Sequence, residues 1–259
     1  MGQTPEYAPG TPCWVDLGTS DIPAATTFYG TLFGWTAETM TEPEAGGYTM
    51  LSLGGKLIAA LGPQQNPGPP YWTTYISVED ADKTTEIAQT AGATVLAPPM
   101  DVFDAGRMAV FADPTGAAIS IWQPGTMKGF EVAGQPSSYC WTELMTRNTD
   151  KATSFYGEVF GWDAHQGGIE GAGDYTEFKN GDRSVAGMMT TPAEVPAEVP
   201  AAWTPYFEVA DTDKTVAAAT KLGGEVLMPA TDIPTVGRFA VLRDPQGAAF
   251  GIIKTTPQQ

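Results

Sequence analysis

Two carboxylates stand in matching sequence contexts and could move protons. Asp16 lies two residues after Trp14, and Glu143 lies two residues after Trp141, each within a run typical of a β-strand. Side chains two apart in a strand share a face, so each carboxylate is expected beside an indole ring. In an apolar pocket its pKa would rise, and it could act as a general base or pair with a cationic ligand group. The alternative is a carboxylate near a strand end that reaches water.

Nucleophilic catalysis has little support in the remaining reactive residues. Cys13 and Cys140 have no CxxC spacing and alternate with the tryptophans, so we expect them to be packing thiols on the opposite strand face. The single histidine, His165, lies in a Gly-rich stretch typical of a solvated loop. No base is therefore expected beside either thiol.

Arginines recur at matching positions in the two halves of the chain. Arg107 and Arg238 each follow a glycine. An arginine fork could clamp a carboxylate or enolate oxygen of a ligand. The alternative is a structural pair with a local carboxylate that fixes a turn, for which Asp113 and Asp244 are close in sequence.

The composition excludes several classes of partner. The 259 residues contain 13 Lys and Arg against 30 Asp and Glu, for a net charge of −17. Such a field repels nucleic acid and anionic membrane surfaces, and it would concentrate cationic ligands. The N-terminus has no basic region followed by an apolar run, and no stretch reaches the length of a membrane span. We therefore expect a cytoplasmic protein without a nucleic-acid or membrane partner.

The whole chain is an internal duplication. The segment 13–35, CWVDLGTSDIPAATTFYGTLFGW, aligns without a gap with 140–162, CWTELMTRNTDKATSFYGEVFGW. The offset of 127 becomes 131 after a Pro-rich loop, and the repeat continues through GRMAVFADPTGAA and GRFAVLRDPQGAA. We predict one domain over residues 1–127, a linker over 128–136 and a second domain over 137–259.

Each half is predicted to contain two copies of a strand, a helix and three strands. Asp21 is a candidate N-cap, Gly34 a candidate helix end, and Gly54-Gly55 a hairpin turn. The Asp-Pro-x-Gly segments suit tight reversals before the last strand. The elements expected in the first half are Pro12–Thr19, Asp21–Gly34, the hairpin Tyr48–Leu61, Trp72–Val78, Lys83–Ala91, Met108–Phe111 and Ala117–Trp122.

These pieces together resemble the vicinal oxygen chelate superfamily of glyoxalases, bleomycin-resistance proteins and extradiol dioxygenases. The resemblance is carried by the strand ending in Thr19-Ser20-Asp21, by Phe28-Tyr29 and Phe33-Gly34-Trp35 in the helix, and by the Asp-Pro-x-Gly turn. The resemblance covers nearly the whole chain, in tandem. Within the superfamily, the chain most resembles two-domain actinobacterial proteins of the hydroxylase- or glyoxalase-like type. The resemblance implies an α+β fold of paired βαβββ modules, whose mixed sheets curl around a ligand cavity.

The resemblance also implies a divalent metal held by His, Gln or Glu, but the corresponding positions here lack such ligands. A dication needs about three or four N or O donors from the protein. The matching positions are Trp14, Thr73 and Ser120 in the first half, Trp141, Thr204 and Gly251 in the second, and less securely Ala59 and Ala186. We therefore expect no metal and no cofactor.

Aromatic and small polar side chains take the place of those ligands. Period-two alternation adds Tyr75 to the face of Thr73, Tyr206 to the face of Thr204, and Trp122 to the face of Ser120. Such a lining suits a flat, largely apolar ligand. The alternative is that the rings simply close the sheet into a solid core. The expected ligand-binding residues are Trp14, Thr73, Tyr75, Arg107, Ser120, Trp122, Trp141, Thr204, Tyr206 and Arg238.

Three functions remain open. The first is metal-free binding of a small aromatic or polyketide-like metabolite or drug. The second is a metal-independent hydroxylase, cyclase or isomerase, or an accessory to one, in which Asp16 or Glu143 is the acid or base. The third is a metal-dependent glyoxalase or dioxygenase. In each case the partner is a small molecule, and the protein is expected to be a monomer resembling a dimer, or a homodimer.

Overall fold

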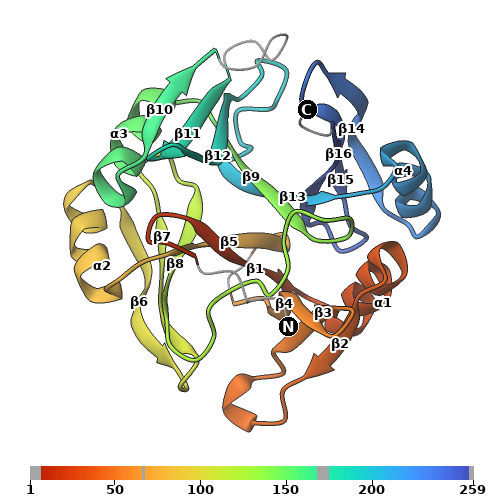
Figure 1. The fold of residues 1–259 in the computed structure, drawn as a ribbon, viewed down its shortest axis with the longest axis horizontal. Coiled ribbons are helices and arrows are strands. Elements are labelled where there is room, and N and C mark those ends of the chain that lie inside the picture. Colours follow the sequence, from red (N-terminus) through yellow and green to blue (C-terminus); the bar gives the residue numbers. More distant parts are fainter. Residues whose placement is uncertain (1–6, 66–67, 168–174, 257–259) are drawn as a thin grey trace.

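Each half of the chain forms one eight-stranded sheet. The computed structural model describes residues 7–65, 68–167 and 175–256 (Figure 1). The strand orders are β2-β3-β4-β1-β5-β8-β7-β6 and β10-β11-β12-β9-β13-β16-β15-β14, so both sheets are open and keep two edge strands. The predicted α+β tandem fold is confirmed, although the sheets do not close into barrels.

The elements of the second half repeat those of the first. The first sheet contains β1 (Pro12–Thr19), β2 (Thr36–Thr39), β3 (Thr49–Leu53), β4 (Lys56–Pro63), β5 (Tyr71–Ser77), β6 (Thr94–Val102), β7 (Gly106–Ala112) and β8 (Ala118–Pro124). The second contains β9 (Tyr139–Thr146), β10 (Asp163–Gln166), β11 (Thr176–Asn180), β12 (Arg183–Thr190), β13 (Ala202–Glu208), β14 (Glu225–Ile233), β15 (Gly237–Arg243) and β16 (Ala249–Thr255). The helices are α1 (Ile22–Phe33), α2 (Ala81–Thr90), α3 (Thr149–Phe160) and α4 (Thr212–Lys221), and a short 3₁₀ helix η1 covers Pro43–Ala45.

The two βαβββ modules of each half join through their first strands. In the first half, β1 runs parallel to β4 and antiparallel to β5, while β5 runs parallel to β8. The second half has the same arrangement around β9 and β13. Module pairing within a half therefore places the first strand of each module at the centre of the sheet.

Local sequence signals set the first helix. The Asp21 carboxylate accepts a hydrogen bond of 2.9 Å from the Ala24 backbone N–H, which caps the N-terminus. Gly34 ends the helix with φ of 76°, a conformation that costs glycine little. One expectation was wrong in detail: His165 lies in the edge strand β10, not in a loop, although it is exposed as expected.

The halves are joined by buried tyrosines that cross between them. Tyr29 on α1 donates a hydrogen bond of 2.9 Å to Asp244 and accepts one of 3.1 Å from the Trp72 indole. The symmetry-related Tyr156 on α3 donates to Asp113 at 2.7 Å. Figure 1 shows the consequence, with α1 beside α4 and α2 beside α3.

The central strands separate an inner face from a face that carries the candidate residues. Cys13, Val15 and Leu17 on β1 are fully buried. The Thr74 and Thr142 hydroxyls meet at 3.0 Å where the two sheets touch. Since neighbouring residues alternate in direction, Asp16 and Glu143 belong to the opposite face of each sheet. We call this the carboxylate face.

Within the part of the chain that the structure describes, no helix has the length and apolar character needed to cross a membrane.

Candidate functional site

A carboxylate bound by two tyrosines forms the centre of the first carboxylate face. Asp16 is partly buried, and its Oδ2 accepts hydrogen bonds from the Tyr48 hydroxyl at 3.0 Å and the Tyr75 hydroxyl at 2.8 Å. The Trp14 indole N–H lies 3.4 Å from the Tyr48 oxygen and completes a chain of donors. We call Asp16, Trp14, Tyr48 and Tyr75 the first cluster.

Strand register brings these residues together. Across the antiparallel β1–β5 pair, Asp16 faces Thr73 and Trp14 faces Tyr75. Across the parallel β5–β8 pair, Tyr75 is level with Ser120. The Ser120 hydroxyl is fully buried beside Tyr75 and makes no hydrogen bond of good geometry to the described residues. The sequence-predicted residues of this face therefore do meet.

The second half builds the same arrangement from different side chains. Glu143 Oε1 accepts a hydrogen bond of 3.1 Å from the Tyr206 hydroxyl. The Trp141 indole donates to the Tyr175 hydroxyl at 3.0 Å. Hydrogen bonding from Tyr175 also lowers the pKa of the Glu143 carboxyl group. Thr204 faces Glu143 across β9 and β13, as Thr73 faces Asp16. We call Glu143, Trp141, Tyr175 and Tyr206 the second cluster.

The environment raises the pKa of both carboxylic acids. Desolvation raises the pKa of Asp16 to about 6, and hydrogen bonds from Tyr75, Tyr48 and Thr73 only partly oppose this rise. Burial likewise raises the pKa of Glu143. Burial and the neighbouring carboxylate raise the pKa of Tyr75, which therefore stays a donor near neutral pH. Because Asp16 Oδ2 already accepts two hydroxyls, the titrating proton belongs on Oδ1.

We expect Asp16 to make stability depend on pH. Its folded pKa of about 6 lies above its ordinary value of 3.8, so the folded state binds more protons between these values. Stability should fall as pH rises through this window, by at most about 3 kcal/mol, and then level off. Urea unfolding of Asp16→Asn and the wild type from pH 3.5 to 7.5 measures the difference.

The matched control has the opposite sign. Arg107 lowers the pKa of the exposed Asp82, so Asp82→Asn should remove stability that exists at neutral pH and disappears as pH falls. If Asp16→Asn and the wild type had parallel curves between pH 4 and 6, the raised pKa of Asp16 would be refuted.

Two glycines let the tyrosines of the second cluster lie directly against the backbone of neighbouring strands. A Cβ at Gly251 would lie 2.2 Å from a ring carbon of Tyr206, so the absence of a side chain lets the ring lie against β16. A Cβ at Gly187 would collide with the Tyr175 hydroxyl. The equivalent positions in the first half are Ser120 and Ala60. The two clusters therefore differ in shape. The second cluster has the longer Glu143 in place of Asp16, and its neighbouring strands have glycine in place of alanine and serine.

Two members of the clusters were not predicted from the sequence. Tyr48 and Tyr175 each come just before a strand and match each other at the repeat offset of 127. The repeat therefore contained a usable signal, namely an identical tyrosine just before the strands β3 and β11, which pair with β4 and β12. The sequence did not show that β4 and β12 place these tyrosines within hydrogen-bonding reach of the carboxylate strands β1 and β9.

The other predicted binding residues make contacts outside the clusters. The Trp122 indole donates to the Met127 carbonyl at 3.0 Å. Arg107 pairs with Asp82 and Asp101, both at 2.8 Å. Arg238 repeats this arrangement with Asp213 and Asp232. The suggested structural partners Asp113 and Asp244 were wrong, because these two aspartates bind their own turns and the crossing tyrosines.

The thiols are packing groups in the structure. Cys13 is fully buried, and its Sγ lies 3.5 Å from the Tyr75 carbonyl oxygen. Cys140 makes the equivalent contact with the Tyr206 carbonyl at 3.4 Å. Burial raises the pKa of both thiols, which disfavours the thiolate that a nucleophile needs.

A family-type metal does not fit the residues present. Each cluster offers one carboxylate, and the described residues contain no group of three or more His, Cys, Asp or Glu side chains placed to hold an ion. Around Asp16 the remaining polar atoms are hydroxyl and indole N–H groups, two of which donate to the carboxylate itself. A dication there would lack the three or four donors that replace its water.

Comparison with known proteins places the chain in a family. A sequence profile of the Glyoxalase/Bleomycin resistance protein/Dioxygenase superfamily matches residues 13–121 and 131–252. A putative glyoxylase of Mycobacterium tuberculosis is 43% identical over 100% of both chains. An anthracycline biosynthesis protein of Streptomyces peucetius is 43% identical, covering 96% of this chain and 94% of its own.

Solved structures support the fold. The Mn(II)-bound glyoxalase from Novosphingobium aromaticivorans superposes with a TM-score of 0.65 at 15% identity, over 95% of this chain and 82% of that one. The 2,3-dioxygenase LapB from Pseudomonas sp. KL28 gives a TM-score of 0.67 at 13% identity, over 98% and 95%. The repeated βαβββ modules and the profile match over both halves together lead to one conclusion: the chain belongs to the glyoxalase, bleomycin resistance protein and dioxygenase superfamily.

Proposed function

We propose that the protein binds a small, flat aromatic or polyketide-like molecule on its carboxylate faces without a metal. The observation that carries this proposal is the hydrogen-bonded Tyr48–Asp16–Tyr75 group, in which one carboxylate oxygen is fixed and the other can meet a ligand. Asp16 and Glu143 are partly accessible, as are Tyr48 and Trp141, whereas the other rings of the clusters are buried. A ligand would stack at the edge of these rings and hydrogen-bond to the carboxyl group.

Charge and relatives support the same class of ligand. The net charge of −17 favours a neutral or cationic ligand over an anionic one on these faces. Relatives at 43% and 42% identity are named anthracycline biosynthesis proteins. Anthracyclines are flat polycyclic aromatic compounds, and some carry an amino sugar. An anthracycline is therefore a suitable probe of binding.

A second candidate function is proton transfer on such a molecule. It is favoured by the raised pKa of Asp16, about 6, which lets the same carboxyl oxygen accept or return a proton near neutral pH. In this case Asp16 Oδ1 takes a proton from an acidic C–H or O–H of the ligand, while Tyr48 and Tyr75 hold Oδ2 in place. Glu143 would do the same in the second half.

Binding can be measured by quenching of tryptophan fluorescence. We expect saturable quenching by daunorubicin, a cationic anthracycline, and by neutral 1,4-dihydroxyanthraquinone, with dissociation constants of about 1 to 10 µM. The double variant Asp16→Asn/Glu143→Gln should bind about tenfold more weakly, because it loses charge-assisted hydrogen bonds.

A matched control separates local contacts from the overall field. Asp82→Asn/Asp213→Asn removes the same two charges from exposed positions and should leave affinity within about twofold of the wild type. Equal losses in both double variants, or no saturable quenching, would contradict binding at the clusters. Recovery of the compound unchanged supports binding alone, whereas conversion that disappears in Asp16→Asn/Glu143→Gln supports the enzyme.

A further inference from the structure

The two halves differ where the linker meets the first sheet. The Phe130 N–H donates to the Cys13 carbonyl at 2.8 Å, and the Glu131 N–H donates to the Leu57 carbonyl at 2.8 Å. The Glu131 carboxylate accepts a hydrogen bond of 2.7 Å from the Leu57 N–H. The Phe130 ring is fully buried, 5.6 Å from the Trp14 ring centre. An aromatic ring followed by a carboxylate thus fills this place in the first half.

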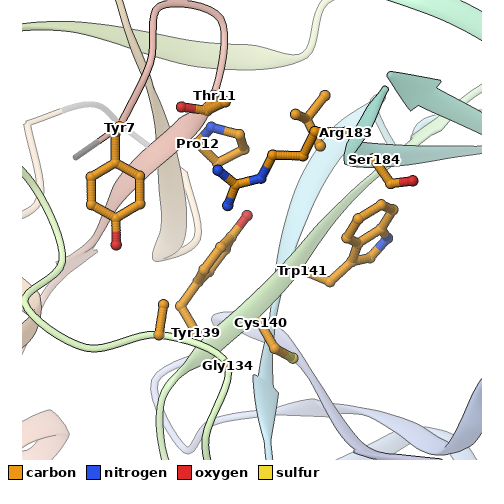
Figure 2. Close-up of a pocket in the computed structure, with 11 residues that line it drawn as sticks. Tyr7, Thr11, Pro12, Gly134, Tyr139, Cys140, Trp141, Arg183 and Ser184 are labelled. Atoms are coloured by element: carbon orange, nitrogen blue, oxygen red, sulfur yellow. The ribbon is translucent and has the colours of Figure 1, made fainter. Parts of the chain in front are cut away.

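The equivalent place in the second half is a pocket. At the repeat offset of 127, Cys140 and Trp141 correspond to Cys13 and Trp14, and Ser184 corresponds to Leu57. No described residue takes the place of the Phe130 ring and the Glu131 carboxylate there. Instead, the structure has a cavity of about 220 Å³. Its walls include Tyr7, Tyr139, Cys140, Trp141, Arg183 and Ser184 (Figure 2).

An unpaired cation is available at this pocket. Arg107, Arg147, Arg238 and Arg243 all bind carboxylates or carbonyl groups. The Arg183 side chain is exposed and forms no hydrogen bond or ion pair with any residue that the structure describes, while the Arg183 backbone pairs with Asn180 in the β11–β12 hairpin. Figure 2 shows its guanidinium group directed into the pocket, toward the Tyr139 hydroxyl.

The charge of Arg183 reaches the tyrosines of the pocket. It opposes the burial that raises the pKa of Tyr7 and of Tyr139. The first-half counterpart of Arg183 is Lys56, at the start of β4. The second half therefore has a guanidinium group, able to bind a carboxylate with two hydrogen bonds, beside the open counterpart of the place that Glu131 occupies.

We propose that this pocket binds a small aromatic carboxylate. The filled site of the first half is the template, so the ring lies against Trp141, as Phe130 lies against Trp14. Phe130 also stacks on Tyr139 at 4.6 Å, and the repeat counterpart of Tyr139 in the second half is Pro12, a wall of the pocket. The carboxylate binds the Arg183 guanidinium and the Ser184 N–H, the counterpart of the Leu57 N–H. This pocket shares Trp141 with the second cluster but does not include the Asp16 or Glu143 carboxylate, on which the proposed function depends.

The test compares an acid with its amide. Ligand-observed NMR or calorimetry should give a dissociation constant below about 1 mM for 3-phenylpropionate, and at least about tenfold weaker binding for 3-phenylpropionamide. The protein's net charge of −17 disfavours nonspecific anion binding, so a preference for the acid identifies a local cation. Arg183→Gln should weaken binding of the acid about tenfold and leave the affinity for the amide unchanged.

Lys56→Gln is the matched control, since it removes one positive charge at the equivalent position of the first half. It should leave binding of both compounds unchanged. Glu143→Gln, in the cluster that shares Trp141 with this pocket, should not weaken binding of either compound, which distinguishes this pocket from the second carboxylate face. Equal affinity for acid and amide, an equal loss in Lys56→Gln, or no saturable binding by about 10 mM would overturn the proposal.

Discussion

Asp113→Ala is expected to lower the free energy of unfolding by about 4 kcal/mol. Asp113 is 4% exposed, and its Oδ1 accepts hydrogen bonds from the Thr115 and Ala117 N–H groups at 2.7 and 3.0 Å. Its Oδ2 accepts the Tyr156 hydroxyl, which comes from the other half of the chain and is fully buried. Alanine would leave these donors without an acceptor, and urea unfolding measures the loss.

The control for this change is an aspartate that forms only an exposed ion pair. Asp101 pairs with Arg107 and has 72% of its side-chain surface exposed, so Asp101→Ala should cost less than about 1 kcal/mol. A double-mutant cycle between Asp113→Ala and Tyr156→Phe should give a coupling energy of about 1.5 to 3 kcal/mol. Additive effects would show that the hydrogen bond across the halves contributes nothing to stability.

Gly251→Ala is expected to cost about 3 kcal/mol and to disturb the second cluster. The new Cβ would lie 2.2 to 2.5 Å from three ring carbons of Tyr206, a side chain that is only 5% exposed. The ring must therefore move, at about 1 to 3 kcal/mol for overpacking and about 1 kcal/mol for the hydrogen bond to Glu143. Thermal unfolding and the fluorescence of the tyrosine and tryptophan residues would report both effects.

The repeat supplies the control at Ser120, which occupies the position equivalent to Gly251. Ser120→Ala removes only a buried hydroxyl that lacks a hydrogen bond of good geometry, so stability should stay within about 1 kcal/mol of the wild type or rise. If Gly251→Ala were equally mild, Tyr206 would not depend on the bare backbone of β16. The difference between the halves would then have no consequence for the second cluster.

The carboxylate strands are predictable from the sequence because their signals are local. The alternation of Cys13, Trp14, Val15 and Asp16 assigned two faces, and the boundaries of β1 agree with the predicted strand. The helix start at Asp21 also follows from a short-range contact, the cap on the Ala24 N–H. The duplication then transferred each of these assignments to the second half without further information.

The contacts that complete the clusters are not local. Tyr48 is 32 residues from Asp16 and Tyr75 is 59 residues away, yet both hydroxyls bind one oxygen. Of the two partners of Arg107, Asp82 on α2 is likewise distant, at 25 residues. Asp101 faces Arg107 across the β6–β7 hairpin, six residues away, so sequence separation alone did not distinguish it from Asp113. Alternation along one strand says which face a residue occupies, but it does not say which strand lies beside it.

By itself, the sequence determined that the chain is a duplicated α+β protein with one carboxylate next to a tryptophan in each half. Strand periodicity and helix capping are short-range signals, and the duplication is found by aligning the chain with itself. Only the tertiary structure decided that the modules pair within each half and that tyrosines hold the carboxylates. It also decided that the linker fills the place beside Trp14 but not the one beside Trp141. Each of these outcomes depends on contacts between residues far apart in the chain, which form only when the whole sheet and both halves pack together.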